Sequence, residues 1–169
     1  MAEPLQPSLR LAGPDDLEFV MATERLPGYD VLTAHWTHEQ HFAALGRGGT
    51  RYLVGCSPRG EREGFAILEN IHDPHEGAKL KRIAVRNPGT GFGRPFLEAV
   101  IRWVFHSTPA ERLWLDVFTY NERARHVYRR AGMREDGLLR QAYVLPSGAR
   151  ADRVIMSLMR SEWVRLSAP

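Results

Sequence analysis

Apolar residues recur along this chain in two spacings, and segments of the two kinds alternate. Short runs with the composition of β-strands lie at 8–12, 51–56, 64–71, 80–85, 113–118, 138–145 and 154–159. Segments with helical spacing lie between several of them. The first opens at Pro14 with two acids behind it, and the second is capped by Thr37 with Gln40 three residues on. The pattern predicts an α/β domain built on a mixed sheet.

The clearest helical pattern follows a glycine-rich turn. Pro95 stands in its predicted first turn, where a missing N–H group costs little. One stripe at helical spacing comprises Phe96, Leu97, Val100, Ile101 and Val104. Farther on, the run 113–118 is apolar at nearly every position, which predicts a central strand covered on both faces. Asn121 is expected to cap the next helix, and Gly132 to end it.

Composition limits the possible classes of protein. A length of 169 residues with 43% hydrophobic content suits one domain, expected to span 1–169. Cys56 is the only cysteine, so an intrachain disulfide is impossible. There is no apolar run of membrane-spanning length and no signal-peptide pattern at the start, so we expect a soluble cytoplasmic protein. The formal charge of +3, carried mostly by arginine, suits a phosphate-bearing ligand, a nucleic acid or a solvated surface equally well.

The turn between the strand 80–85 and the following helix reads Arg86-Asn87-Pro88-Gly89-Thr90-Gly91-Phe92-Gly93. Glycines allow the main chain to approach a ligand, and a helix start leaves N–H groups unpaired, so this arrangement favours an anion. A P-loop would need Lys and then Ser or Thr after the last glycine, where Arg94 and Pro95 stand. A Rossmann loop is a weak competitor, because the third glycine comes one residue early.

This strand, loop and helix resemble the coenzyme A pyrophosphate loop of the GNAT acetyltransferases. The family motif, Gln/Arg-x-x-Gly-x-Gly/Ala, fits with either Arg86 or Pro88 as its leading residue. The next segment is also similar to the family: a strand at 113–118, then Asn121-x-x-Ala124-x-x-x-Tyr128, then Ala131-Gly132-Met133. The tail is similar to the branch that acetylates the N-termini of ribosomal proteins. The resemblance covers roughly 64–163.

The resemblance implies a mixed, mostly antiparallel central sheet flanked by helices, whose central strands splay apart to form the acyl-CoA site. About 1–60 would form the acceptor side, and 64–163 the acyl-CoA-binding core. Tyr128 would be the acid that protonates the leaving thiolate, a reasonable task for a phenol with a pKa near 10. The residues expected to bind the cofactor are Ile83, Ala84, Val85, Gly89, Thr90, Gly91, Phe92, Gly93, Arg94 and Asn121.

The general base and the acceptor site are less defined. GNAT enzymes often use a glutamate on the strand before the loop, but this strand reads Lys79-Leu80-Lys81-Arg82. Glu69 on the neighbouring strand is the candidate base; Glu76, an ordered-water relay and the absence of a dedicated base stay open. Candidates for the acceptor site, around the helix-loop-helix near the N-terminus, are Glu24, Tyr29, Trp36 and His41.

The resulting hypothesis is an N-acetyltransferase that moves an acetyl group from acetyl-CoA to a primary amine of a small molecule or a protein N-terminus. Transfer would be by direct attack in a ternary complex. The alternative is a catalytically inactive CoA-sensing module. No metal is expected, because the chemistry needs none and the histidines near His72 suit an exposed turn better than a metal site. We expect no nucleic acid or membrane partner, and the resemblance allows a homodimer.

Overall fold

The computed structural model describes residues 7–29, 31–32, 35–75 and 77–168. One sheet has the strand order β1-β2-β3-β4-β5-β7-β6, and only the β4–β5 pairing is parallel. The mixed, mostly antiparallel sheet expected from the sequence is therefore confirmed. In chain order the strands are β1 Ser8–Leu11, β2 Arg51–Cys56, β3 Arg62–Glu69, β4 Ala78–Val85, β5 Arg112–Phe118, β6 Arg134–Val144 and β7 Arg150–Met159.

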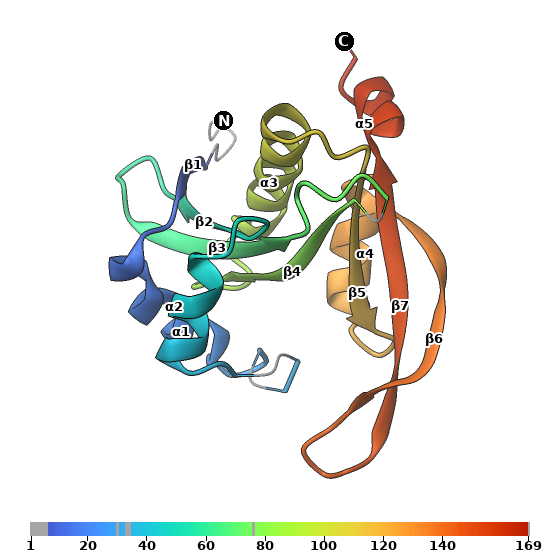
Figure 1. Cartoon of the computed structure of the whole chain (residues 1–169), viewed down its shortest axis with the longest axis horizontal. Helices are drawn as coiled ribbons and strands as arrows, with labels where there is room; N and C mark the ends of the chain where they lie inside the picture. The colour runs from blue at the N-terminus through green and yellow to red at the C-terminus, as the bar shows by residue number, and fades with distance from the viewer. Residues whose placement is uncertain (1–6, 30, 33–34, 76, 169) are drawn as a thin grey trace.

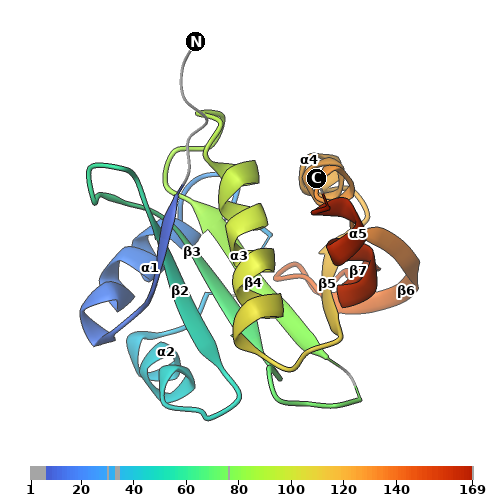
Figure 2. The ribbon, with the colours of Figure 1, turned by 90° about the horizontal axis from the view of Figure 1, so that it is seen from above.

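Helices cover the two faces of the sheet (Figures 1 and 2). They are the 3-10 turn η1 Pro14–Asp16, α1 Leu17–Glu24, α2 His38–Leu45, α3 Gly93–Ser107, α4 Glu122–Arg130 and α5 Arg160–Leu166. One apolar core lies between α3, α4 and the sheet, and a smaller one lies between α1, α2 and strands β2 to β4. Within the part of the chain described here, none of the helices is both long and apolar enough to cross a bilayer.

Most strand and helix limits agree with the apolar pattern, and the differences have physical reasons. Strand β6 begins at Arg134 rather than 138, because an exposed edge strand needs no apolar alternation. Strand β5 is not covered on both faces as predicted. Leu113 and Leu115 are buried, whereas Trp114 and Asp116 lie on a partly exposed face. Helix α5 was not predicted at all.

A buried polar network joins the helices of the smaller core to the sheet. Glu24, the last residue of α1, accepts a hydrogen bond from Arg82 of β4 at 2.9 Å and lies 3.2 Å from His41 of α2. The other ring nitrogen of His41 lies 2.9 Å from the hydroxyl of Tyr52 on β2. All four side chains are buried. The predicted Thr37 cap, whose hydroxyl accepts a bond from the Gln40 N–H, fixes the start of α2 and hence the position of His41.

Asp16 gives the fold a pH dependence that can be measured. Its carboxylate accepts two hydrogen bonds of 2.7 Å from Arg10 and one of 2.9 Å from the Gly13 N–H. These bonds, chiefly those from Arg10, lower the pKa of Asp16 to about 2. A carboxyl whose pKa is depressed by folding stabilises the protein above its unfolded pKa, and this stability is lost as pH falls through the folded pKa.

We therefore expect Asp16→Asn to flatten the acid limb of the stability curve. Between pH 6 and pH 2.5 the free energy of unfolding of the wild type should fall by about 1–2 kcal/mol more than that of the variant. Urea unfolding at several pH values measures both. Parallel curves for the two proteins would contradict the assignment.

Candidate functional site

The two central strands separate after a short parallel contact. Strands β4 and β5 pair only at Ala78 with Leu113 and at Lys79 with Trp114, and then diverge toward their C-terminal ends. A bulge precedes this opening: Ile67 of β3 pairs with Arg82, but the next residue of β3 pairs with Leu80. The extra residue lies on β4, and a bulge of this kind bends the strand that carries it. The open ends leave room for a ligand, as the resemblance implied.

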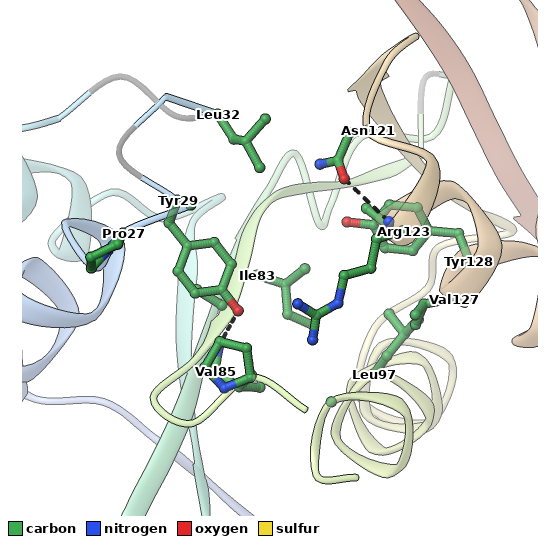
Figure 3. A pocket seen from close by; sticks show the side chains of 15 residues that line it. Pro27, Tyr29, Leu32, Ile83, Val85, Leu97, Asn121, Arg123, Val127 and Tyr128 are labelled. Carbon is green, nitrogen blue, oxygen red and sulfur yellow. Dashed lines mark hydrogen bonds between the residues drawn. The ribbon is translucent and has the colours of Figure 1, made fainter. Parts of the chain in front are cut away.

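A pocket of about 260 Å³ fills this opening (Figure 3). Strand β4, helices α3 and α4 and the segment after α1 form its walls, most of which are apolar. The lining residues are Pro27, Gly28, Tyr29, Leu32, Ile83, Ala84, Val85, Pro88, Gly93, Leu97, Asn121, Arg123, Ala124, Val127 and Tyr128. Residues distant in the sequence, from the predicted acceptor side and the predicted cofactor core, therefore meet at one site.

The main chain of β4 presents donors to this pocket. The N–H of Arg86 bonds the Glu63 carbonyl of the β3 side at 2.7 Å. The N–H of Val85 faces away from β3 and donates to the Tyr29 hydroxyl at 3.1 Å. Because successive residues of a strand alternate in direction, the N–H of Ile83 lies on the same side as that of Val85. Two main-chain donors of β4 are thus directed toward the gap rather than toward a neighbouring strand.

The glycine-rich loop leads from the pocket to the start of α3. Gly89 and Gly91 have φ values of 92° and 89°, which non-glycine residues rarely adopt. Phe92 anchors the loop, since its side chain is buried and stacks on Phe96 with 5.6 Å between ring centroids. Among the described residues, no main-chain N–H from 89 to 94 has a hydrogen-bond partner. These donors remain available for an anion at a helix N-terminus.

Tyr128 reaches the pocket from the inner face of α4. Its hydroxyl points into the space between β4 and α4, and Tyr29 lies on the opposite side (Figure 3). Burial raises the pKa of Tyr128 above its ordinary value, and the nearby Tyr29 and Asp116 raise it further. The phenol is therefore a proton donor that stays protonated at neutral pH. Asn121 caps α4 by accepting a hydrogen bond from the Ala124 N–H at 3.2 Å, so its amide nitrogen still faces the pocket rim.

Two polar residues of this region were not singled out from the sequence. Arg123, in the first turn of α4, directs its guanidinium into the pocket and has no partner among the described residues (Figure 3). Its position in the sequence, two residues after the Asn121 cap, could have indicated that it lies near the pocket. Asp116 is 10% exposed and pairs with Lys79 at 2.8 Å and with Arg153. Asp116 is the one carboxylate in the apolar run 113–118, and this could have identified it as a candidate site residue.

Several predicted site residues lie outside the pocket lining. Glu69 pairs with Lys81 at 3.6 Å on the strands beside the pocket. Glu24, 1% exposed, has its carboxylate bonded within the buried network. Trp36 packs over the Arg82 guanidinium at 4.3 Å. Tyr29 is thus the predicted acceptor-site residue that does line the pocket, and Glu76 lies outside the described residues.

The predicted loop residues divide between the pocket and its approach. Gly93 lines the pocket, and Phe92 supports the loop from beneath. Gly89, Thr90 and Gly91 are exposed beyond it, and Arg94 pairs with Glu98 at 2.8 Å on the first turns of α3. Across the residues with described positions, no group of three or more His, Cys, Asp or Glu could hold a metal ion.

Comparisons with known proteins match this architecture. A family model described as an acetyltransferase (GNAT) domain matches residues 9–134. The [ribosomal protein bS18]-alanine N-acetyltransferase of Haemophilus influenzae is 33% identical over 112 residues, which are 64% of this chain and 73% of the relative.

Solved structures show the same fold at lower identity. Spermidine N-acetyltransferase from Vibrio cholerae, in complex with CoA and spermine, is 20% identical with a TM-score of 0.83, over 94% of this chain and 98% of that one. A dodecameric structure of the V. cholerae enzyme is also 20% identical, with a TM-score of 0.80 over 96% of this chain and 99% of that one. At this identity the likeness concerns the fold alone.

Proposed function

Because this chain belongs to the GNAT family of acetyltransferases, we propose that it transfers an acetyl group from acetyl-CoA to a primary amine by direct attack in a ternary complex. One observation carries the proposal at this site. Free main-chain donors at 89–94 open into an apolar pocket between splayed strands, and that pocket ends at a protonated phenol, Tyr128. This sequence of features suits a ligand with a diphosphate, a slender arm and a thiol leaving group.

The residues fit each part of acyl-CoA. The N–H groups of the loop would hold the diphosphate, and Arg123 adds a positive charge inside the pocket. The outward N–H of Val85 would pair with the arm, which leaves the Ile83 N–H on the same side for the thioester end. When bound, acyl-CoA supplies an acetyl group activated as a thioester. Among the described residues that line the pocket there is no serine or cysteine, which supports direct transfer rather than an acyl-enzyme.

The catalytic roles follow from position and protonation. The Tyr128 hydroxyl would give its proton to the departing thiolate sulfur. The Ile83 N–H would stabilise negative charge on the carbonyl oxygen under attack. The pocket lining, as described, contains no carboxylate, so Glu69 could act as a base only through bridging water. A water relay to Glu69, or an acceptor that arrives uncharged, would then take the place of a base within the pocket.

This last point bears on the acceptor. An α-amino group with a pKa of about 8 is partly neutral at pH 7.5, whereas lysine and polyamine nitrogens stay charged and need a base. A polyamine would also gain from carboxylates in the site, and none lines the described pocket. We therefore propose a peptide α-amine as acceptor, in line with the bS18-alanine relative. A cytoplasmic location and a homodimer remain predictions.

Titration calorimetry with acetyl-CoA, followed by thiol release with a panel of amines, tests the function. We expect binding in the micromolar range, thiol release with short peptides that have free N-termini, and little release with spermidine. Binding without thiol release from any amine would favour an inactive CoA-sensing module. No binding at millimolar acetyl-CoA would refute the proposal as a whole.

The loop provides a matched pair of variants. Gly91→Ala places a side chain at φ 89° and at the diphosphate, so acetyl-CoA affinity should fall by roughly 10- to 100-fold, the scale of one or two charge-assisted hydrogen bonds. Gly60→Ala introduces the same strain at φ 81° in the β2–β3 turn, also in open space. Its affinity should match the wild type. Equal losses in the two variants would show a general effect of strain.

A further inference from the structure

The bond between Tyr29 and Val85 occupies a donor that the proposed cofactor also needs. The Val85 N–H has no strand partner, because β5 has already diverged from β4, and the residue is only 8% exposed. A buried N–H without an acceptor is costly, and the Tyr29 hydroxyl supplies the acceptor at 3.1 Å. The segment after α1 therefore completes the edge of β4.

We propose that Tyr29 is a positioning residue whose hydroxyl holds the place of the acyl-CoA arm on the Val85 N–H, and that cofactor binding displaces it. The inference rests on the proposed function, in which the outward N–H of Val85 pairs with that arm. One N–H makes one strong hydrogen bond, so the hydroxyl and a carbonyl of the arm compete for it. The free energy of the Tyr29 bond must then be given up on binding, which weakens the binding of acyl-CoA by that amount.

The surroundings of Tyr29 allow this exchange. The N–H of Tyr29 donates to the Leu26 carbonyl, and its carbonyl accepts from the Leu32 N–H. Farther along the chain, Trp36 packs over the Arg82 guanidinium. These main-chain bonds of Tyr29 do not involve its hydroxyl, so they can persist when the hydroxyl leaves Val85.

Displacement would also act on the acceptor side of the pocket. Pro27, Gly28 and Leu32 of the same segment also line the pocket. Pro27 and Tyr29 lie across the pocket from Tyr128 (Figure 3). A released Tyr29 changes the wall against which an amine would bind.

Tyr29→Phe tests the competition, because it removes the hydroxyl and keeps the ring. By calorimetry, CoA should bind the variant about 2- to 10-fold more tightly than the wild type, the factor expected for one net hydrogen bond. The free variant should melt at a lower temperature, and saturating CoA should raise its Tm by more than it raises that of the wild type. Unchanged or weaker CoA binding by a folded variant would overturn the inference, since a merely structural tyrosine gives that result.

Tyr52→Phe is the matched control. It removes another buried hydroxyl, bonded to His41 outside the pocket, so it should lower the Tm and leave the CoA affinity unchanged. Tighter CoA binding by this control would mean that loosening alone explains the effect and would overturn the inference. If neither the wild type nor Tyr29→Phe binds CoA, the proposed function fails together with this inference. If the wild type binds and the variant binds no more tightly, only this inference fails.

A second measurement uses the unaltered protein and does not depend on the folding of a variant. Tyrosine nitration followed by mass spectrometry should show that CoA increases modification of Tyr29 and decreases that of Tyr128, which serves as the internal reference. Protection of Tyr29 by CoA, parallel to that of Tyr128, would overturn the displacement.

Discussion

Replacing Tyr128 by phenylalanine is expected to lower the rate of acetyl transfer by about 100- to 10,000-fold, the contribution usual for a positioned general acid. The ring is retained, so the packing of α4 against the pocket should persist. Affinity for acetyl-CoA should therefore stay within about 2-fold of the wild type. Stopped-flow thiol release measures the rate, and calorimetry measures the binding.

The pH dependence separates an acid from a packing residue. Burial raises the pKa of Tyr128 above its ordinary value, and Tyr29 and Asp116 act in the same direction. A phenol with a raised pKa keeps its proton through and beyond the ordinary titration range near pH 10. Activity of the wild type should thus show no alkaline loss at the position of an ordinary tyrosine. A kcat for Tyr128→Phe equal to that of the wild type would disprove the acid role.

Asp116 also raises the pKa of Tyr128, although its own carboxylate is paired with Lys79 and Arg153.

A tyrosine outside the pocket provides the control for the Tyr128 variant. Tyr143→Phe removes a hydroxyl from β6, far along the hairpin and outside the pocket lining, and should leave kcat unchanged. A comparable loss in Tyr143→Phe would indicate that the assay reports stability rather than chemistry.

The sequence predicts the local backbone features of the candidate site better than its long-range contacts. Gly91 and Asn121 perform backbone tasks, a positive φ and a helix cap, which depend on residue type and local order. These tasks can be recognised from spacing alone. Strand limits follow for the same reason where apolar residues alternate, and fail for β6, which is exposed at every residue except Tyr143.

The region around Glu24 and Tyr29 depends on contacts between distant segments. Glu24 looked available because nothing near it in the sequence indicates that Arg82 and His41 would enclose it. Tyr29 looked like one aromatic residue among several, until β4 brought an unpaired N–H to its hydroxyl. Long-range pairing of polar groups leaves no periodic pattern, and this is why those roles required a structure.

The buried pair of Glu24 and Arg82 should dominate the response of the fold to mutation. Arg82→Met leaves the Glu24 carboxylate, 1% exposed, with His41 as its remaining side-chain partner in the described part of the chain. Breaking a buried ion pair on one side costs about 3–5 kcal/mol. Such a loss is a large fraction of the 5–15 kcal/mol that stabilises a typical domain. We expect the free energy of unfolding, measured in urea, to fall by that amount.

The double variant Glu24→Leu/Arg82→Met distinguishes an unpaired charge from lost packing. Replacing both partners by apolar side chains removes the stranded carboxylate, so most of the lost stability should return. Arg134→Met is the exposed comparison: Arg134 pairs with Glu162 at 3.2 Å while 74% exposed, and its loss should cost less than about 1 kcal/mol. If Arg82→Met costs no more than Arg134→Met, the buried pair does not hold the helices to β4. Burial lowers the pKa of Arg82, and the charge of Glu24 opposes that effect. The Arg82 guanidinium also packs over the Trp36 ring, so this contact should loosen in Arg82→Met as well.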